Sequence, residues 1–356
     1  DRGPNTSVGG FAGTTWALVE AGGTPVELTY ELDTVARNDF SGTLPGAFSA
    51  HPKYDPHTGE LHAVCYAWAQ WLDHVQYVVV GPDGRVRHTL DVPLAGMPMV
   101  HDMSLTPNWV VVYDQPCTVD LDLAFSGRFP FRWNPDYGNR VGLLPRSGAG
   151  GTGATAADIV WIDVPLGYVF HPVNAFERGD GTVVIDVCNY PTMFARDVLG
   201  PFGDGAMSRL ERWELSPAGR RASITVVDES PNEFPRHRGS AGLREYRFAY
   251  CAAPSLDPTA GWPTVKHDLA TGARNVFDHG PGRVAGEPVF VTRGDREDDG
   301  WLVTFVHDLA DGSTELAVLD AQDFERGYVA QVALPQRVPL GFHGAWIADT
   351  AVAPPA

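Results

Sequence analysis

Four of the twelve histidines in this 356-residue chain lie in local sequences that differ from those around the other eight. Each follows an Ala, Val or Phe and precedes a Pro, Asp or Gly, which is typical of strand ends and tight turns. They are His51 in AFSAHPKYD, His101 in PMVHDMSL, His171 in GYVFHPVNA and His343 in PLGFHGAWI. The other eight stand among polar turn residues, and we expect them to be exposed; examples are His57, His62, His88 and His279.

The spacing of these four histidines is too wide for a local metal-binding motif. Successive separations are 50, 70 and 172 residues, whereas a helical HExxH motif places its ligands four residues apart. Such separations suit ligands gathered on the axis of a radially repeated fold, in which each repeat supplies one inner residue. Imidazole nitrogens suit zinc, copper, iron and nickel. The alternative is that the rings are structural and the protein is a non-catalytic binding propeller.

Three glutamates can complete such a centre, because four neutral imidazoles leave the charge of a metal ion uncompensated. Glu20 ends the run TTWALVE, Glu233 lies in SPNEFPRH and Glu287 lies in VAGEPVFV. Each stands in an apolar or proline-bounded stretch, where an unpaired carboxylate is costly. We expect these carboxylates to lie behind the ligands and to fix each ring through its other N–H group.

The elements that must position these residues are strands. Runs rich in Val, Ile, Tyr, Trp and Phe end in turn residues, and PDG at 82–84, GDG at 179–181 and ADG at 310–312 predict hairpins. Only 119–125 and 191–200 suggest short helices. Many short strands over this length favour an all-β propeller, and no linker divides the chain, so we expect one domain over residues 1–356.

Composition excludes several classes of function. A net charge of −18 disfavours nucleic acid and docking on anionic lipid, although a shallow apolar contact with a membrane stays open. Four widely separated cysteines fit small buried side chains in a reducing compartment, and we expect a cytoplasmic protein. No apolar run is long enough to span a bilayer as a helix, and the glycine-rich stretch RSGAGGTGATAAD (146–158) is typical of a loop.

The chain resembles the carotenoid cleavage oxygenases, which include the lignostilbene dioxygenases, in ordered segments along nearly its whole length. These segments are AHPKYDPHTGEL (50–61), HDMSLTPNWVVVYDQP (101–116), FPFRWNPDYGNRVGLLPR (129–146), FHPVNAFE (170–177), NEFPRH (232–237), KHDLATG (266–272), GEPVFVTRGDREDDGW (286–301), ELAVLDAQDF (315–324) and LPQRVPLGFHGAWI (334–347).

The resemblance implies a seven-bladed propeller with a small cap of loops and helix over its iron-binding face. It implies a non-heme Fe(II) held by the four histidines, with Glu20, Glu233 and Glu287 hydrogen-bonded to three of the rings. Family chains begin further upstream, so we expect this one to lack part of the first blade and the cap. The implied reaction is cleavage of a conjugated C=C bond with O₂ to give two carbonyl products.

The implied substrate is an apolar polyene in an aromatic tunnel. The segment that resembles the cap offers Phe129, Phe131, Trp133 and Tyr137 as lining residues. Stilbene-cleaving members carry a lysine, which holds the phenol, directly before the glutamate that matches Glu20. This chain has Val19 there, which favours a carotenoid or apocarotenoid over a stilbene. Isomerohydrolase chemistry on a retinyl ester is a further alternative.

Overall fold

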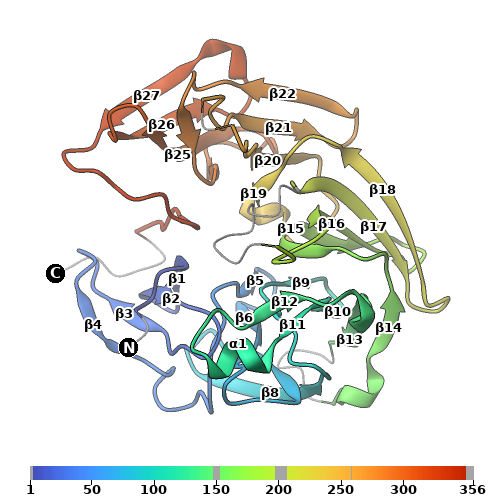
Figure 1. The fold of residues 1–356 in the computed structure, drawn as a ribbon. Helices are drawn as coiled ribbons and strands as arrows, with labels where there is room; N and C mark the ends of the chain where they lie inside the picture. Colours follow the sequence, from blue (N-terminus) through green and yellow to red (C-terminus); the bar gives the residue numbers. More distant parts are fainter. Residues whose placement is uncertain (1–2, 147–152, 197–206, 258, 350–356) are drawn as a thin grey trace.

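The fold is almost entirely β-sheet. The computed structural model describes residues 3–146, 153–196, 207–257 and 259–349. Within these ranges lie strands β1 to β27, one α-helix and four short 3₁₀ helices. Six antiparallel sheets, each of four or five strands, stand around a common centre as blades of a propeller (Figure 1).

The first three blades take up the first half of the chain. Blade 1 consists of β1 (Ser7–Phe11), β2 (Thr14–Leu18), β3 (Val26–Leu28) and β4 (Thr34–Arg37). Blade 2 consists of β5 (Lys53–Asp55), β6 (Glu60–Cys65), β7 (His74–Val80) and β8 (Val86–Pro93). Blade 3 consists of β9 (Met103–Leu105), β10 (Trp109–Asp114), β13 (Arg140–Pro145) and β14 (Val160–Asp163).

The last three blades follow in chain order. Blade 4 consists of β15 (Tyr168–Glu177), β16 (Val183–Tyr190), β17 (Arg209–Ser216) and β18 (Arg221–Asp228). Blade 5 consists of β19 (Glu233–Arg236), β20 (Phe248–Ala252), β21 (Thr264–Asp268) and β22 (Ala273–Phe277). Blade 6 consists of β23 (Arg283–Ala285), β24 (Val289–Thr292), β25 (Gly300–Asp308), β26 (Thr314–Asp320) and β27 (Tyr328–Ala333).

The all-β propeller is confirmed, but the expected seven blades are wrong for the described residues, which form six. Blade 3 uses more chain than a plain four-stranded sheet, because an excursion separates β10 from β13. This excursion holds the hairpin of β11 (Cys117–Val119) and β12 (Phe131–Trp133), the helix α1 (Leu121–Phe125) and the 3₁₀ helix η1 (Pro135–Tyr137). After β27, residues 334–349 form no strand. The described chain therefore has strands for six blades and for the separate two-stranded sheet of β11 and β12.

The turn signals identify the hairpins correctly. The three predicted turns join β7 to β8, β15 to β16 and β25 to β26. Their glycines, Gly84, Gly181 and Gly312, have φ values of 71°, 83° and 76°, which side chains with a Cβ adopt only at a cost. The predicted helix at 119–125 is present as α1. At 191–200 the prediction is wrong for residues 191–196, which form no helix, and residues 197–200 lie outside the described part.

The core lies between neighbouring blades, where the faces of adjacent sheets pack together. Its largest cluster joins blades 2, 3 and 4, and all four cysteines are buried and unpaired, as expected. Blade 6 differs, because the face of β25 that carries Val303 and Phe305 is only half-covered by the described residues and Phe305 is 41% exposed. The opposite face of β25, with Leu302 and Val306, is fully buried.

Candidate metal centre

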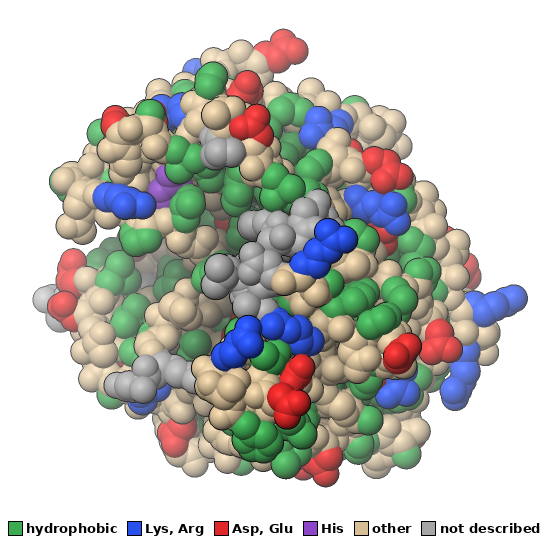
Figure 2. Space-filling view, viewed as in Figure 1, with side chains coloured by type: hydrophobic (Ala, Val, Ile, Leu, Met, Phe, Trp, Pro, Cys, Tyr) green, Lys and Arg blue, Asp and Glu red, His purple; other side chains and the backbone are tan. Residues whose placement is uncertain are grey.

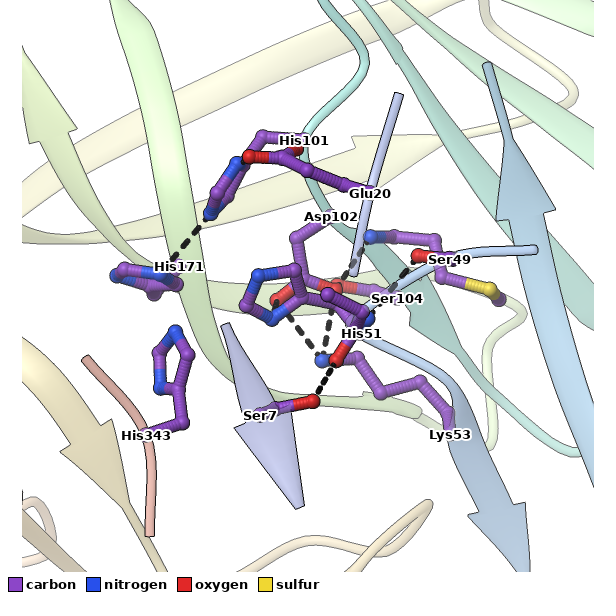
Figure 3. A network of polar contacts seen from close by, with 12 residues as sticks. Ser7, Glu20, Ser49, His51, Lys53, His101, Asp102, Ser104, His171 and His343 are labelled. Atoms are coloured by element: carbon purple, nitrogen blue, oxygen red, sulfur yellow. Dashed lines mark hydrogen bonds and ion pairs between the residues drawn. The ribbon is translucent and has the colours of Figure 1, made fainter. Parts of the chain in front are cut away.

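The four singled-out histidines meet at the centre of the propeller. His51 and His101 stand two residues before β5 and β9, and His171 lies within β15, so three successive blades contribute one ring each. His343 comes from the segment after β27 and points towards His171 (Figure 3). One nitrogen from each ring lies within 4.8 Å of a nitrogen of every other.

An irregularity in β15 aims His171 at the centre. The pairing between β15 and β16 shifts register on both sides of Pro172. Proline has no N–H group to donate to the ladder and is found in strands chiefly at edges and bulges. The bulge bends the strand at this point and frees the preceding residue from the regular alternation of side chains. His51 is also followed by a proline, Pro52, directly before β5.

The three glutamates each contact one ring through its Nδ1 atom. Glu20 Oε2 lies 2.9 Å from Nδ1 of His101. Glu233 Oε2 lies 2.5 Å from Nδ1 of His171, and Glu287 Oε1 lies 3.0 Å from Nδ1 of His343.

These contacts determine where the ring protons lie. An ionised carboxylate only accepts hydrogen bonds, so Nδ1 carries the hydrogen and the Nε2 lone pair of a neutral ring is free. The Nε2 atoms of His101 and His171 are 3.2 Å apart, and two lone pairs at that distance repel each other. The Nε2 atoms of His51 and His343 are buried without a hydrogen-bond partner. Four converging lone pairs, with carboxylates behind three rings, fit a divalent transition-metal ion.

The glutamates differ in their electrostatic surroundings. Burial raises the pKa of Glu233 to about 7. Burial acts in the same direction on Glu287, but Arg236 and His343 outweigh it and lower the pKa of Glu287 to about 2. Burial also opposes ionisation of Glu20, and His101, together with the hydroxyl of Tyr66, reverses that effect and lowers its pKa. Only Glu287 therefore owes its low pKa partly to a guanidinium group.

Two aromatic rings hold the ligands in place. Phe170 lies edge-on to His101, with ring centroids 4.8 Å apart. Phe234 stacks on His171 at 5.5 Å, and its φ of 50° is unusual for a residue with a Cβ. Backbone strain of this kind occurs preferentially at functional sites.

An apolar cavity of about 650 Å³ adjoins the histidines. His101, His171 and His343 contribute to its wall, as do two of the candidate substrate residues, Val19 and Phe129. Its other apolar lining residues include Met99, Phe170, Phe194, Phe234, Trp262 and Leu340. The site thus combines a polar cluster of ligand atoms with an apolar chamber.

The other candidate substrate residues lie elsewhere. Phe131 is buried in the core cluster of blades 2 to 4, and Trp133 packs against that cluster. The hydroxyl of Tyr137 is 2.6 Å from both a carboxylate oxygen of Asp114 and the backbone carbonyl of Ala95. None of the three lines the 650 Å³ cavity as formed by the described residues.

Sequence reasoning missed three charged residues around the histidines: Lys53, Asp102 and Arg236. Lys53 forms an ion pair with Asp102, and Arg236 forms one with Glu287. Two of these residues could have been found from their positions in the sequence, because Lys53 is two residues from His51 and Asp102 directly follows His101.

The expectation that the remaining eight histidines are exposed is wrong for several of them. His62, His267, His279 and His307 are all buried. His62 contacts the hydroxyl of Tyr77 through Nδ1, and His279 contacts Thr264 and Tyr328. A polar neighbour in sequence does not imply exposure when the strand itself is buried.

Comparison with known proteins gives consistent results. Residues 2–348 match the family described as retinal pigment epithelial membrane protein. A carotenoid cleavage oxygenase of Mycobacterium tuberculosis is 39% identical, over 98% of this chain and 78% of that protein. The crystal structure of Pseudomonas brassicacearum lignostilbene dioxygenase superimposes with a TM-score of 0.86 at 28% identity, covering 97% of this chain and 75% of that one. Cobalt-substituted Synechocystis apocarotenoid oxygenase gives a TM-score of 0.83 at 26% identity, covering 96% and 73%.

Proposed function

The chain belongs to the retinal pigment epithelial membrane protein family, which includes carotenoid cleavage oxygenases, and we propose that it is a non-heme Fe(II) dioxygenase. In this proposal it cleaves a conjugated C=C bond of a carotenoid or apocarotenoid with O₂ and yields two carbonyl products. The observation that carries the proposal is the convergence of four imidazole rings, with one nitrogen of each within 4.8 Å of the others, three of which line an apolar cavity.

The ligands in this proposal are His51, His101, His171 and His343, and the residues behind them are Glu20, Glu233 and Glu287. Bound Fe(II) would supply the redox chemistry with O₂. Neutral imidazoles favour the ferrous state, because they add no negative charge that would stabilise Fe(III). The three carboxylates fix the ring tautomers and compensate part of the metal charge from a distance.

The cavity supports an apolar substrate. Phe129 and Phe194 pack against each other at 4.8 Å and line the wall. Such a surface binds a polyene by excluding water. Val19 stands beside Glu20 on the same wall and offers no charge to a phenol. This apolar position favours a carotenoid or apocarotenoid.

Cleavage of a stilbene is the second candidate. Its support is the likeness of the fold to that of a lignostilbene dioxygenase, with a TM-score of 0.86. Both reactions require the same metal centre. The two substrates differ in the chemistry of their ends.

A contact with a membrane surface would give the protein access to a water-insoluble substrate. No helix in the described part of the chain is long and apolar enough to cross a membrane. The short helix α1 exposes Leu121 and Phe125, the latter at 85%. Four residues later Phe129 lines the cavity. We propose that α1 dips into the lipid surface beside the cavity.

The experiment that tests the proposal is metal analysis followed by a product assay. The chain is reconstituted anaerobically with Fe(II), and about one iron per chain is expected, with loss of that iron in His343→Ala. Apocarotenals and hydroxystilbenes are then supplied with ¹⁸O₂, and label in both carbonyl products is expected. A folded chain that binds no iron, or aldehydes without label, would contradict the proposal.

A further inference from the structure

His51 is the exception among the four rings. The other three each have a glutamate oxygen within 3.0 Å of Nδ1. The carboxylate that faces Nδ1 of His51 belongs to Asp102, and its Oδ2 atom is 3.7 Å away. This distance is too long for a hydrogen bond.

Lys53 holds Asp102 in this position. Its Nζ atom lies 2.7 Å from Oδ1 and 2.9 Å from Oδ2 of Asp102, and the backbone N–H of Met103 also donates to Oδ1 (Figure 3). The side chain of Asp102 is only 3% exposed, whereas that of Lys53 is 30% exposed. The ammonium group therefore contacts both oxygens of a buried carboxylate whose Oδ2 atom also faces Nδ1 of His51.

We propose that Lys53 keeps Asp102 out of hydrogen-bond reach of His51 and so makes His51 the most weakly held ligand of the metal centre. This inference rests on the proposed function, since it concerns the same four histidines. A carboxylate that accepts from a ligand ring raises its basicity and fixes its orientation, and loss of such a partner typically changes metal affinity 10–100-fold. In this chain Lys53 withholds that partner from one ring. Lys53 is a positioning residue that acts through Asp102.

The inference is tested by removing the ammonium group. It predicts slower metal release, whereas a substitution that only damages the metal centre would make release faster. Lys53→Met keeps an unbranched side chain about as long as the aliphatic part of the lysine but removes the ammonium group, so Asp102 is free to accept from Nδ1–H of His51. The probe is Co²⁺, because cobalt substitution is compatible with a structurally similar oxygenase. Release of Co²⁺ to excess chelator should be about ten-fold slower in Lys53→Met than in the wild type. Lys53→Arg keeps the cation and should release Co²⁺ at the wild-type rate.

Two further variants test whether the effect passes through Asp102 and whether it is specific to Lys53. Lys53→Met combined with Asp102→Asn should lose the gain, because an amide is a weaker acceptor and carries no charge. The only other lysine of the chain, Lys266 in blade 5, also forms an ion pair, with Asp298 in the loop between β24 and β25 of blade 6. Lys266→Met removes a lysine of the same kind away from the histidines and should leave Co²⁺ release unchanged.

A spectroscopic measurement checks the geometry independently of release rates. In the Co²⁺-loaded protein each coordinated imidazole has one exchangeable, hyperfine-shifted Nδ1–H proton. Three of these protons are hydrogen-bonded to glutamate and should exchange slowly with solvent, and that of His51 should exchange fastest. Lys53→Met should slow the exchange of this fourth proton.

The outcomes distinguish this inference from the proposed function. If the wild type binds no Co²⁺, the metal centre itself is wrong. If the wild type binds Co²⁺ but a folded Lys53→Met releases it equally fast or faster, only the role of Lys53 is wrong. A gain that survives Asp102→Asn would show that the effect does not pass through Asp102, and it would also overturn the inference.

Discussion

Arg236 and Glu287 form an ion pair between blades 5 and 6, with Nη2 of Arg236 2.7 Å from Oε2 of Glu287. The same nitrogen donates to the backbone carbonyl of Gly344, and the backbone N–H of Gly344 donates to Glu287. His343, which lies in a segment without regular structure, is thereby tied to two blades. These contacts hold the ring of His343 in place, as the strand β15 does for the ring of His171.

The first prediction is that Arg236→Met weakens metal retention without changing the fold. The variant leaves Glu287 without its cation and Gly344 without one of its tethers, so the ring of His343 is less well held. Metal release should become about ten-fold faster. Arg238→Met is the matched control, since Arg238 also links blade 5 to the loop after β24 through backbone carbonyls, but contacts none of the four histidines. Equal effects of the two variants would contradict the prediction.

The second prediction concerns Val19 and substrate choice. Val19→Lys places an ammonium group on the wall of the apolar cavity, next to Glu20. An unpaired charge there disfavours a polyene, and kcat/KM for an apocarotenal should fall by about ten-fold or more. Activity towards a 4-hydroxystilbene should rise relative to the apocarotenal. Val19→Met, which keeps the wall apolar, should change the ratio little; a similar ratio in both variants would mean that this position does not select the substrate.

The sequence was sufficient to predict the ring of strands and the four converging histidines, because both depend on local patterns. Alternating apolar residues and turn glycines report hairpins. A histidine between an apolar residue and a Pro, Asp or Gly correctly indicates a strand end for His51 and His101, but His171 lies within β15 and His343 in a segment without a strand. Pairing of Glu20, Glu233 and Glu287 with three of the rings also followed from their apolar surroundings, since a carboxylate in such a place requires a partner.

The number of blades and the role of the aromatic residues could not be predicted in this way. The pattern of β25 is apolar on both faces, which predicts burial on both, yet only the face with Leu302 is fully covered in the described structure. Phe131 and Phe129 are two residues apart and look alike in sequence, but one is in the core and the other lines the cavity. Which face of a short strand points inwards depends on tertiary packing. The ion pair between Lys53 and Asp102 could not be predicted from the sequence, because the two residues are 49 positions apart.

The third prediction concerns the exposed side chains of α1. Leu121→Ser combined with Phe125→Ser removes the apolar surface that we expect to enter lipid. Binding to vesicles of zwitterionic phosphatidylcholine, measured by sedimentation, should fall by about 30-fold or more, because each of the two large side chains contributes on the order of 1–2 kcal/mol and about 1.4 kcal/mol corresponds to a factor of ten. Val276→Ser, on the outer strand of blade 5, removes an exposed apolar side chain elsewhere and should not reduce binding. Equal loss in both would mean that α1 is not the membrane contact.

The fourth prediction concerns His62 and the pH dependence of stability. Burial, reinforced by the nearby Arg146, lowers the pKa of His62 from 6.5 to about 3. The ring stays neutral in the folded protein while the unfolded chain takes up a proton below pH 6.5. The stabilisation is therefore present above pH 6.5 and is lost as the pH falls towards 3, at up to about 1.4 kcal/mol per pH unit.

Replacing this ring by a group that does not titrate isolates its contribution. His62→Gln retains a hydrogen-bonding partner for Tyr77 and should destabilise the metal-free protein at pH 7. Its free energy of unfolding, measured in urea at pH 7, 6 and 5, should approach that of the wild type as the pH falls, because only the wild type loses the contribution of His62. A difference that stays constant over this range would mean that the ring has the same pKa in the folded and unfolded states, and it would contradict the prediction.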